Sequence, residues 1–318
     1  MGEMDPGMTL PSVTIVIPTK DRLDALRECL GRITPFVDAH PECEIFVSDD
    51  GDASATRAAL AKQFPTVQVV QGPHCGPAAN RNYGAKQGKG ALIVFLDDDC
   101  IPETNIIEVY QSAARDNPSI DVFEGRITMQ GKMSSFADTA PENETGGFLW
   151  SCNFAVRRTL FDRLNGFDER YPFAAMEDVD LRLRIKTLTS MKFLPDARVW
   201  HPVQRRTGWR TVKHGALSVL LYLHLHGREK TGNSAGSFLR SILRILYKGA
   251  LRYSKEGRFK DPGHLGYLSR ANLQLALMML GWRYRRTLAP VLFRPCCKGC
   301  ESILAVLGTE RPPGWSRT

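Results

Sequence analysis

The sequence predicts an α/β domain with a mainly parallel central sheet, followed by a basic helical region. Over the first two hundred residues, short apolar runs alternate with segments whose leucines recur at helical spacing, the pattern of strand–helix–strand units. Charge divides the chain at the same place. Residues 1–200 carry 21 basic and 29 acidic side chains, whereas residues 201–318 carry 21 and 5, so the net charge changes from −8 to +16. We therefore expect a catalytic or metal-binding domain over residues 1–203 and a basic extension over residues 204–318.

Helices are expected between the apolar runs of the first region. One follows Asp21, which we expect to cap it, and a second spans about residues 54–63. A third opens at Pro77, because the missing N–H of proline costs nothing in a first helical turn. The predicted strands are Val13–Ile17, Glu44–Val47, Val67–Val70 and Ala91–Leu96.

Acidic residues follow two of these strands directly. Asp97, Asp98 and Asp99 come after an apolar run, and alternation along an extended chain places Asp97 and Asp99 on one side. Two such carboxylates repel each other unless a cation lies between them, and oxygen ligands suit Mg²⁺ or Mn²⁺. Asp49 and Asp50 repeat the arrangement and are placed to accept hydrogen bonds from a base or ribose. A solvated, aspartate-rich turn is the alternative at Asp97–Asp99, and a helix-capping or turn sequence is the alternative at Asp49 and Asp50.

Three further positions carry candidate chemistry. Arg81 lies near a helix start, either as a solvated surface arginine or as a contact for an anion that would offset its unfavourable position in the helix dipole. Glu177 and Asp178 open another helical stretch, either as ordinary first-turn acids or as a general base for a hydroxyl. His201 follows a strand and is either structural or a further metal ligand.

The order of these segments resembles that of the family 2 inverting glycosyltransferases, which have the GT-A fold with its Rossmann-like sheet. The resemblance runs from about Val13 to His201. Agreement of many segments in the same order is more specific than any one of them. The matching segments are VTIVIPTKDR (13–22), FVSDDGD (46–52), GPAANRNYGA (76–85), VFLDDDC (94–100), CNFAVRR (152–158), NGFDE (165–169) and MEDVDLRLR (176–184).

The resemblance implies a hexosyltransferase reaction in polysaccharide biosynthesis, with a nucleotide-sugar donor (a UDP-sugar as first guess) and a glycan or lipid-linked acceptor. It also implies a divalent metal, Mn²⁺ or Mg²⁺. The segment from Thr128 to Gly147 matches no firm pattern, so the acceptor is poorly constrained. The implied roles are donor nucleotide binding for Pro18, Thr19, Asp49, Asp50 and Arg81, metal binding for Asp97, Asp99 and His201, sugar or acceptor binding for Asn153, and base catalysis for Asp178 with Glu177 beside it.

The basic extension is expected to be helical and to lie against a membrane. Leu239 and Leu243 belong to an apolar face, while Arg240 and Arg244 lie among basic residues on the other side. This pattern is typical of a helix in the interface of an anionic membrane; a helical extension packed on the catalytic domain is the alternative. No nucleic-acid-binding module is present, so we expect no nucleic-acid partner.

The cysteine pattern and the absence of signal and membrane-spanning sequences indicate a cellular compartment for the protein. Most of the eight cysteines are scattered singly, as in reduced cytosolic proteins. With neither a secretory signal nor an apolar run long enough to span a bilayer, we expect a cytoplasmic protein, peripheral on the cytoplasmic face of a membrane. Cys296, Cys297 and Cys300 cluster without a fourth ligand close in sequence. We expect an inert thiol cluster there, with lipidation or metal binding as alternatives.

Three other functions are compatible with parts of this pattern. A nucleotidyltransferase would need a glycine-rich phosphate loop after the first strand, where this chain has PTKDR. A dinucleotide oxidoreductase would need a G-x-G-x-x-G motif there. A catalytically inactive, membrane-anchored nucleotide-sugar-binding or scaffold protein is the main alternative, and Asp97, Asp99 and Asp178 argue against it.

Overall fold

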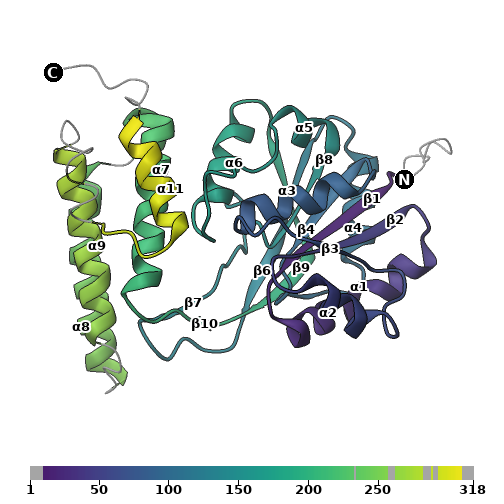
Figure 1. Ribbon diagram of the computed structural model, residues 1–318, viewed down its shortest axis with the longest axis horizontal. Coiled ribbons are helices and arrows are strands. Elements are labelled where there is room, and N and C mark those ends of the chain that lie inside the picture. Colours follow the sequence, from purple (N-terminus) through teal and green to yellow (C-terminus); the bar gives the residue numbers. More distant parts are fainter. Residues whose placement is uncertain (1–9, 233, 257–261, 282–287, 289–292, 310–318) are drawn as a thin grey trace. The chain divides into compact units, whose positions relative to one another are not determined.

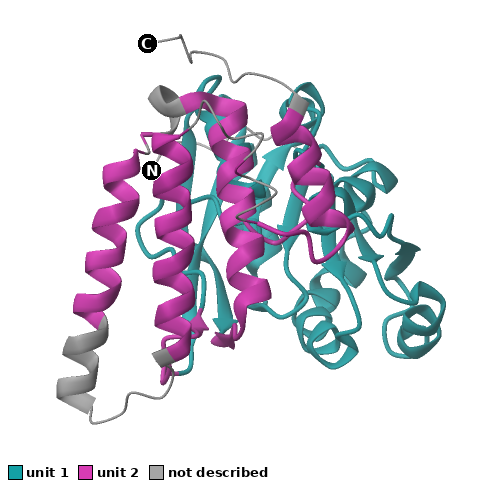
Figure 2. Ribbon diagram, turned by 60° about the vertical axis from the view of Figure 1, so that its left-hand side comes forward, with its two compact units in different colours: residues 1–131, 140–169, 177–202 teal, residues 132–139, 170–176, 203–318 magenta. Residues whose placement is uncertain are grey.

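The computed structural model describes residues 10–232, 234–256, 262–281, 288 and 293–309, which divide into two compact units (Figure 2). The first unit comprises residues 1–131, 140–169 and 177–202, and the second comprises residues 132–139, 170–176 and 203–318. The final passage of the chain into the second unit, after Pro202, lies one residue from the predicted boundary. Two short segments of the predicted catalytic range, 132–139 and 170–176, group with the second unit.

The first unit is built on an eight-stranded sheet with the order β3-β2-β1-β4-β8-β6-β9-β5. Its first four strands are parallel and correspond to the four predicted strands, which confirms the α/β class. Beyond β4, strand β8 pairs antiparallel with both β4 and β6, and β9 runs parallel to β6. The strands are β1 (Val13–Thr19), β2 (Cys43–Asp49), β3 (Gln68–Gln71), β4 (Leu92–Leu96), β5 (Ile101–Pro102), β6 (Val122–Gln130), β8 (Asn153–Arg157) and β9 (Met191–Pro202).

Helices cover both faces of this sheet, as Figure 1 shows. Alternation along β1 sends Ile15 to one face, where it packs among residues of α1 and α4, and Val16 to the other. Val16 packs among residues of α3, α5 and α6. Because both faces are covered, the strands are continuous apolar runs. The helices are α1 (Leu23–Ala39), α2 (Ala53–Leu60), α3 (Pro77–Gln87), α4 (Ile106–Asp116), α5 (Arg158–Arg163) and α6 (Glu177–Lys186).

Three of the four helix starts predicted in the first region are confirmed. Pro77 is the first residue of α3, and Glu177 is the first residue of α6. Helix α2 begins one residue before the predicted span and ends inside it, with Asp52 accepting hydrogen bonds from the Ser54 and Ala55 amides. The predicted cap of α1 is wrong. Asp21 lies outside the helix at φ 54°, and Arg22 is the N-cap residue without a side-chain capping bond. The Arg22 side chain instead forms ion pairs elsewhere in the unit, described below.

The second unit is mainly helical, as predicted. Its helices α7 (Trp209–Thr231), α8 (Ala235–Glu256), α9 (Pro262–Leu280) and α11 (Lys298–Thr309) pack so that α9 contacts both α7 and α8, and α11 contacts α7. A short antiparallel pair joins β7 (Asp138–Thr139) to β10 (Gln204–Arg205), where Arg205 forms an ion pair of 2.8 Å with Asp138. Of the helices in the described part of the chain, none is long and apolar enough to cross a bilayer.

Helix α8 has two apolar stripes instead of one apolar face. Phe238 is buried, and α8 packs along α9. Leu239, Leu243 and Leu246 recur at helical spacing and remain exposed, with 68% of Leu243 accessible. Packing against a neighbouring helix therefore accounts for part of the apolar surface of α8 and leaves the second stripe unexplained.

Candidate functional site

The candidate site lies where β2, β1 and β4 end side by side in the sheet. Because these strands are parallel and adjacent, Asp49, Thr19 and Asp97 emerge at the same edge. Helix α3 and the first turn of α6 bring Arg81 and Glu177 to the same place, since Arg81 contacts both Asp97 and Glu177. The structure thus gathers at one edge residues that are up to about 160 positions apart in the chain.

Arg81 is the centre of this arrangement. Only 3% of the residue is exposed, and its Nη2 lies 2.6 Å from Asp97 Oδ1, while its Nη1 lies 3.3 Å from Glu177 Oε1. The guanidinium also lies over the Phe167 ring, 5.6 Å from its centroid. A buried cation requires such partners, because leaving it unpaired would cost several kcal/mol.

The three consecutive aspartates lie in a turn after β4 and not in an extended segment, and they have different partners. Asp97 pairs with Arg81 of α3, whereas Asp98 accepts a hydrogen bond of 2.6 Å from the Thr19 hydroxyl and pairs with Arg22 at 2.7 Å. Burial works against ionised Asp97, but the adjacent Arg81 outweighs it and holds the pKa of this carboxyl below its usual value. Burial raises the pKa of Asp98 to about 7. Asp98 is therefore a framework residue, and Asp97 and Asp99 are the candidates for ligand contact.

Asp97, Asp99 and His201 form a group that fits a divalent cation. One ligand atom of each lies within 4.8 Å of the others, and His201 Nε2 is 3.5 Å from Asp99 Oδ1. The other ring nitrogen, Nδ1, lies 2.9 Å from the Pro202 carbonyl oxygen, which fixes the ring orientation. Two carboxylates and one imidazole suit Mn²⁺ or Mg²⁺ and leave coordination positions open for other ligands.

Glu177 and Asp178 open α6 as adjacent buried carboxylates. Burial, followed by the charge of Asp178, raises the pKa of Glu177 to about 8, and burial also raises the pKa of Asp178. Met176, directly before them, has φ 75°, a left-handed conformation that is rare outside glycine. The backbone strain at Met176 lies next to two perturbed acids, an association that is frequent at functional sites.

The predicted nucleotide-binding residues occupy the ends of β1 and β2. Pro18 pairs in register with Ser48 of β2, and the Thr19 carbonyl accepts a hydrogen bond of 2.9 Å from the Asp50 amide. Asp49 uses its carboxylate to hold the turn into α2, accepting from the Gly51 amide at 2.7 Å and the Thr56 hydroxyl at 2.6 Å. These contacts preorganise the edge of the sheet.

Asp50 acts on the segment that leads into α3. Its carboxylate accepts hydrogen bonds from the His74 amide at 2.9 Å and the Gly76 amide at 3.3 Å. Gly76 is the N-cap of α3 and has φ 99°, so the turn needs glycine at this position. Asp50 thereby links the end of β2 to the helix that carries Arg81.

Asn153 is placed differently from the ligand contact that the resemblance implies. Its amide nitrogen donates to the Arg126 and Ala197 carbonyls, both at 2.9 Å, and its oxygen accepts from the Tyr110 hydroxyl at 2.7 Å. Both amide hydrogens are therefore used inside the fold. This network ties β8 to β6 and β9 and gives Asn153 a positioning role beneath the site.

Two charged residues of this unit were not predicted. Arg22 pairs with Asp98 and also with Asp99 at 2.7 Å, which places a half-exposed cation beside the candidate metal ligands. The sequence signal that could have identified Arg22 is its position in the PTKDR loop directly after the first strand. Glu124 is buried in β6 and accepts hydrogen bonds from the amides of Gly147, Phe148 and Leu149. Glu124 thereby orders the end of the segment from Thr128 to Gly147, which matches no firm family pattern. No local sequence pattern identifies Glu124 as a residue with this role.

Residues 14–164 match the model of glycosyl transferase family 2. This chain carries a family 2 glycosyltransferase domain. The match spans β1 to α5 and so includes Arg81 and the aspartates after β4, whereas Glu177, Asp178 and His201 lie beyond it. The resemblance that the sequence suggested is therefore confirmed at the level of the family.

Two curated relatives share part of the family 2 domain. Glycosyltransferase AglE of Haloferax volcanii is 31% identical over 105 residues, which are 31% of this chain and 34% of that protein. The N-acetylglucosaminyl-diphospho-decaprenol L-rhamnosyltransferase of Mycobacterium tuberculosis is 34% identical over 113 residues, 35% of this chain and 34% of that protein. The matches thus span about a third of each relative.

A solved structure extends the likeness over more of the chain. The mannosyltransferase PcManGT from Pyrobaculum calidifontis, in complex with GDP-Man and Mn²⁺, superposes with a TM-score of 0.53 at 16% identity. The match covers 86% of this chain and 88% of that one. At this level of identity the comparison shows the shared GT-A fold.

Replacing Arg81 tests the constraint at the centre of the site. We expect Arg81→Met to destabilise the protein by about 1–3 kcal/mol at neutral pH, because the partly buried Asp97 carboxylate would lose its cation and hydrogen-bond donor. Denaturant unfolding measures the change, and Arg32→Met on the exposed side of α1 is the matched control, with an expected change below about 0.5 kcal/mol.

The same variant has a predicted pH dependence. Arg81 lowers the pKa of Asp97 in the folded protein. The Arg81–Asp97 pair therefore stabilises the fold above the pKa of aspartate in the unfolded chain, about 3.9. This stabilisation is lost as the pH falls through the lower pKa of Asp97 in the folded protein. The difference between wild type and Arg81→Met should therefore shrink in acid. An equal difference at pH 7 and pH 3 would contradict the assignment.

Proposed function

We propose that the family 2 domain transfers a hexosyl group from a nucleoside diphosphate sugar to an acceptor hydroxyl, with inversion at the anomeric carbon. The observation that carries the proposal is the convergence of Arg81, Asp97 and Asp99 at one edge of the sheet, within the residues that match the family 2 model, with Glu177 of α6 paired to Arg81. Ligands of parallel α/β sheets bind at this edge.

The donor would lie across the ends of β1, β2 and β4. Asp50, together with Pro18, Thr19 and Asp49, shapes the base and ribose end, where the carboxylates already order the surrounding turns. Arg81 and Arg22 supply positive charge for the diphosphate. A divalent ion held by Asp97, Asp99 and His201 would stabilise the charge of the leaving group.

Asp178 is the proposed general base. It would take the proton from the acceptor hydroxyl while that oxygen forms a bond to the anomeric carbon and the bond from that carbon to the diphosphate oxygen breaks. One displacement from the opposite face inverts the configuration. The raised pKa of Asp178 supports this role, because a more basic carboxylate removes a proton more effectively near neutral pH.

The inactive-scaffold alternative is less favoured. A scaffold would have no need to keep two perturbed carboxylates beside a strained residue and a buried arginine, at a cost in stability. Conversion of donor by the purified protein decides between the two, whereas binding alone does not.

Calorimetric titration tests the donor site first. We expect one of UDP, GDP, CDP and dTDP to bind with Mn²⁺ present, with UDP tested first, and binding to disappear with EDTA or in Asp99→Ala. Asp116→Ala, an exposed position on α4, is the control and should bind as wild type does. Folded protein that binds none of the four would remove the support for a donor site.

Changing Asp178 tests the base. We expect Asp178→Asn to lower kcat by about 10²–10⁴-fold while nucleotide binding is kept, since only proton transfer is removed. The exposed Asp196 gives a matched control, Asp196→Asn, with unchanged kcat. In wild type, burial raises the pKa of Asp178, so kcat/KM should fall as the pH falls through a value above the usual 3.9 or so for aspartate. Full transfer by Asp178→Asn would exclude the role.

We propose further that the acceptor is lipid-linked and that α8 touches an anionic membrane surface. The exposed stripe of Leu239, Leu243 and Leu246 lies beside exposed Arg240 and Arg244, in a region with a net charge of +16. The mycobacterial relative is named for a decaprenol-linked substrate, which supports this class of acceptor.

Vesicle co-sedimentation tests the membrane contact. We expect the protein to bind phosphatidylglycerol vesicles, less at high salt, and Leu243→Glu to weaken binding by about tenfold or more, because a buried leucine contributes about 1.5–3 kcal/mol. Leu188→Glu, at an exposed leucine of the first unit, is the matched control. Equal binding of all three proteins would exclude α8 as the contact.

A further inference from the structure

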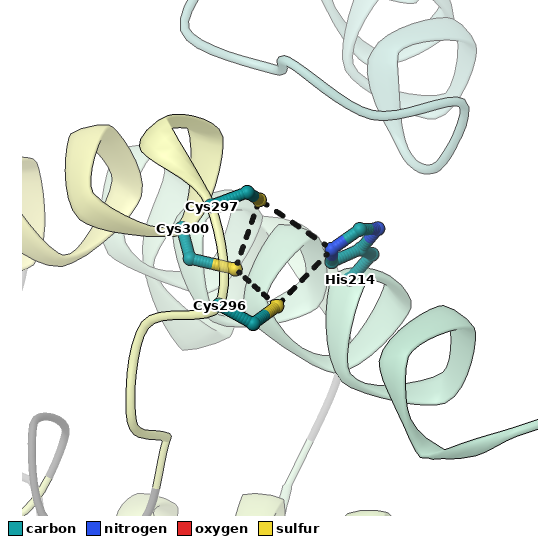
Figure 3. Close-up of side chains that lie close together, drawn as sticks. All are labelled: His214, Cys296, Cys297 and Cys300. Atoms are coloured by element: carbon teal, nitrogen blue, oxygen red, sulfur yellow. Dashed lines mark hydrogen bonds between the residues drawn. The ribbon is translucent and has the colours of Figure 1, made fainter.

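A cluster of thiols and one imidazole in the second unit has no part in the proposed reaction. Cys296, Cys297 and Cys300 belong to the CCKGC segment at the start of α11, and His214 belongs to α7. Figure 3 shows the four side chains pointing toward one another. The sequence offered three ligands and no close histidine, and the structure supplies the fourth from 82 residues before Cys296.

The distances within this cluster are those of a tetrahedral metal site. His214 Nε2 is 3.6 Å from Cys296 Sγ and 3.7 Å from Cys297 Sγ, and Cys300 Sγ is 3.5 Å from Cys296 Sγ and 3.6 Å from Cys297 Sγ. The four ligand atoms all lie within 4.8 Å of one another. Metal–ligand bonds of about 2.3 Å to sulfur and 2.0–2.1 Å to nitrogen, arranged tetrahedrally, imply ligand separations of about 3.8 Å between sulfurs and about 3.6 Å between sulfur and nitrogen.

We infer that His214, Cys296, Cys297 and Cys300 bind a structural zinc ion. Thiolate and imidazole ligands in a tetrahedral arrangement select zinc over the oxygen-preferring Mg²⁺ and Mn²⁺. Four protein ligands fill the coordination sphere, and a closed site of this kind stabilises the fold and does not activate water. The chain would thus hold two metal sites with different ligands: mainly carboxylate oxygens at the sheet edge and mainly thiolates in the second unit.

The surroundings of the cluster fit this assignment. The His214 ring stacks on Phe173 with centroids 3.8 Å apart and planes 2° from parallel, which orients the imidazole. A Cβ at Gly299 would come within 2.9 Å of the Phe173 ring, so glycine is required between Lys298 and Cys300. The Cys297 carbonyl accepts hydrogen bonds from the amides of Cys300 at 3.0 Å and Glu301 at 3.3 Å, which turns the thiols toward one point.

Charge near the cluster is also complementary. Three thiolates and one Zn²⁺ leave a net charge of −1, and Arg210, one turn before His214, lies within hydrogen-bonding reach of the Cys297 sulfur. Cys296 and Cys297 precede the first turn of α11, where the positive end of the helix dipole favours thiolates. No disulfide competes for these thiols, since all three are free.

The ion would connect two helices that are distant in sequence. His214 lies in the second turn of α7, and Cys300 lies in the first turn of α11. Besides the packing between α7 and α11, zinc would fix the starts of these helices against each other. The site is independent of the proposed transferase reaction, which uses residues of the first unit.

Metal analysis of the full chain tests the inference. We expect protein purified under reducing conditions to retain stoichiometric zinc through EDTA washing and gel filtration, as measured by mass spectrometry of the metal. Reconstitution with Co²⁺ should give the visible absorption of tetrahedral, thiolate-bound cobalt. This second measurement uses the wild-type chain and so does not depend on the folding of any variant.

Variants identify the ligands. We expect His214→Ala and Cys297→Ser to lose zinc, and His214→Cys to retain it, because a fourth thiolate can replace the imidazole. Cys75→Ser, at an exposed cysteine of the first unit, is the matched control and should keep zinc. Asp99→Ala should keep it as well, which separates this site from the donor site.

Two outcomes would overturn the inference. Wild-type chain that takes up neither zinc nor cobalt when reduced would exclude a metal site, and so would zinc content unchanged in both His214→Ala and Cys297→Ser. Neither result would affect the proposed transferase activity, and inactivity of a zinc-loaded chain would not affect the zinc site.

Discussion

The buried guanidinium of Arg81 is the interaction on which the first unit's site depends. A desolvated cation must be paired, and its two partners come from the end of β4 and the start of α6, 16 and 96 residues further along the chain. One charge therefore fixes a strand end and two helices against one another. It also keeps Asp97 ionised despite burial, so that the carboxylate remains available at the edge of the sheet where Asp99 and His201 lie close by.

Much of this arrangement could be predicted from local pattern. Continuous apolar runs are typical of strands in a sheet that is covered on both faces, and the four parallel strands appear where predicted. The aspartates after β4 depart from the predicted alternation, because they lie in a turn and Arg22 pairs with both Asp98 and Asp99. Parallel strands expose their carboxyl ends at one edge, so the gathering of Asp49, Asp97 and Arg81 followed from the predicted strand–helix order. What these residues do there remains a proposal.

Other features depend on contacts that no local pattern contains. Asp21 has the composition of a helix cap, but the chain passes it at positive φ and Arg22 takes the cap position. Asn153 is polar and belongs to the CNFAVRR segment of the family resemblance. Its amide nevertheless forms hydrogen bonds with two carbonyls and with Tyr110 inside the fold. His214 looks isolated because its partners lie more than eighty residues away. For Asn153 and His214 the deciding partners are remote in sequence, and only the tertiary structure identifies them.

The two units alternate along the chain, so neither is one continuous stretch of sequence. The chain passes between them five times, at residues 131, 139, 169, 176 and 202. The strand β7 and the residue Phe173 both come from stretches inserted within the first unit, yet they complete a β-pair with β10 and a ring stack with His214. The second unit is therefore not contiguous in the sequence, and truncation after Pro202 would leave β7 without its partner strand β10 and Phe173 without its stacking partner His214.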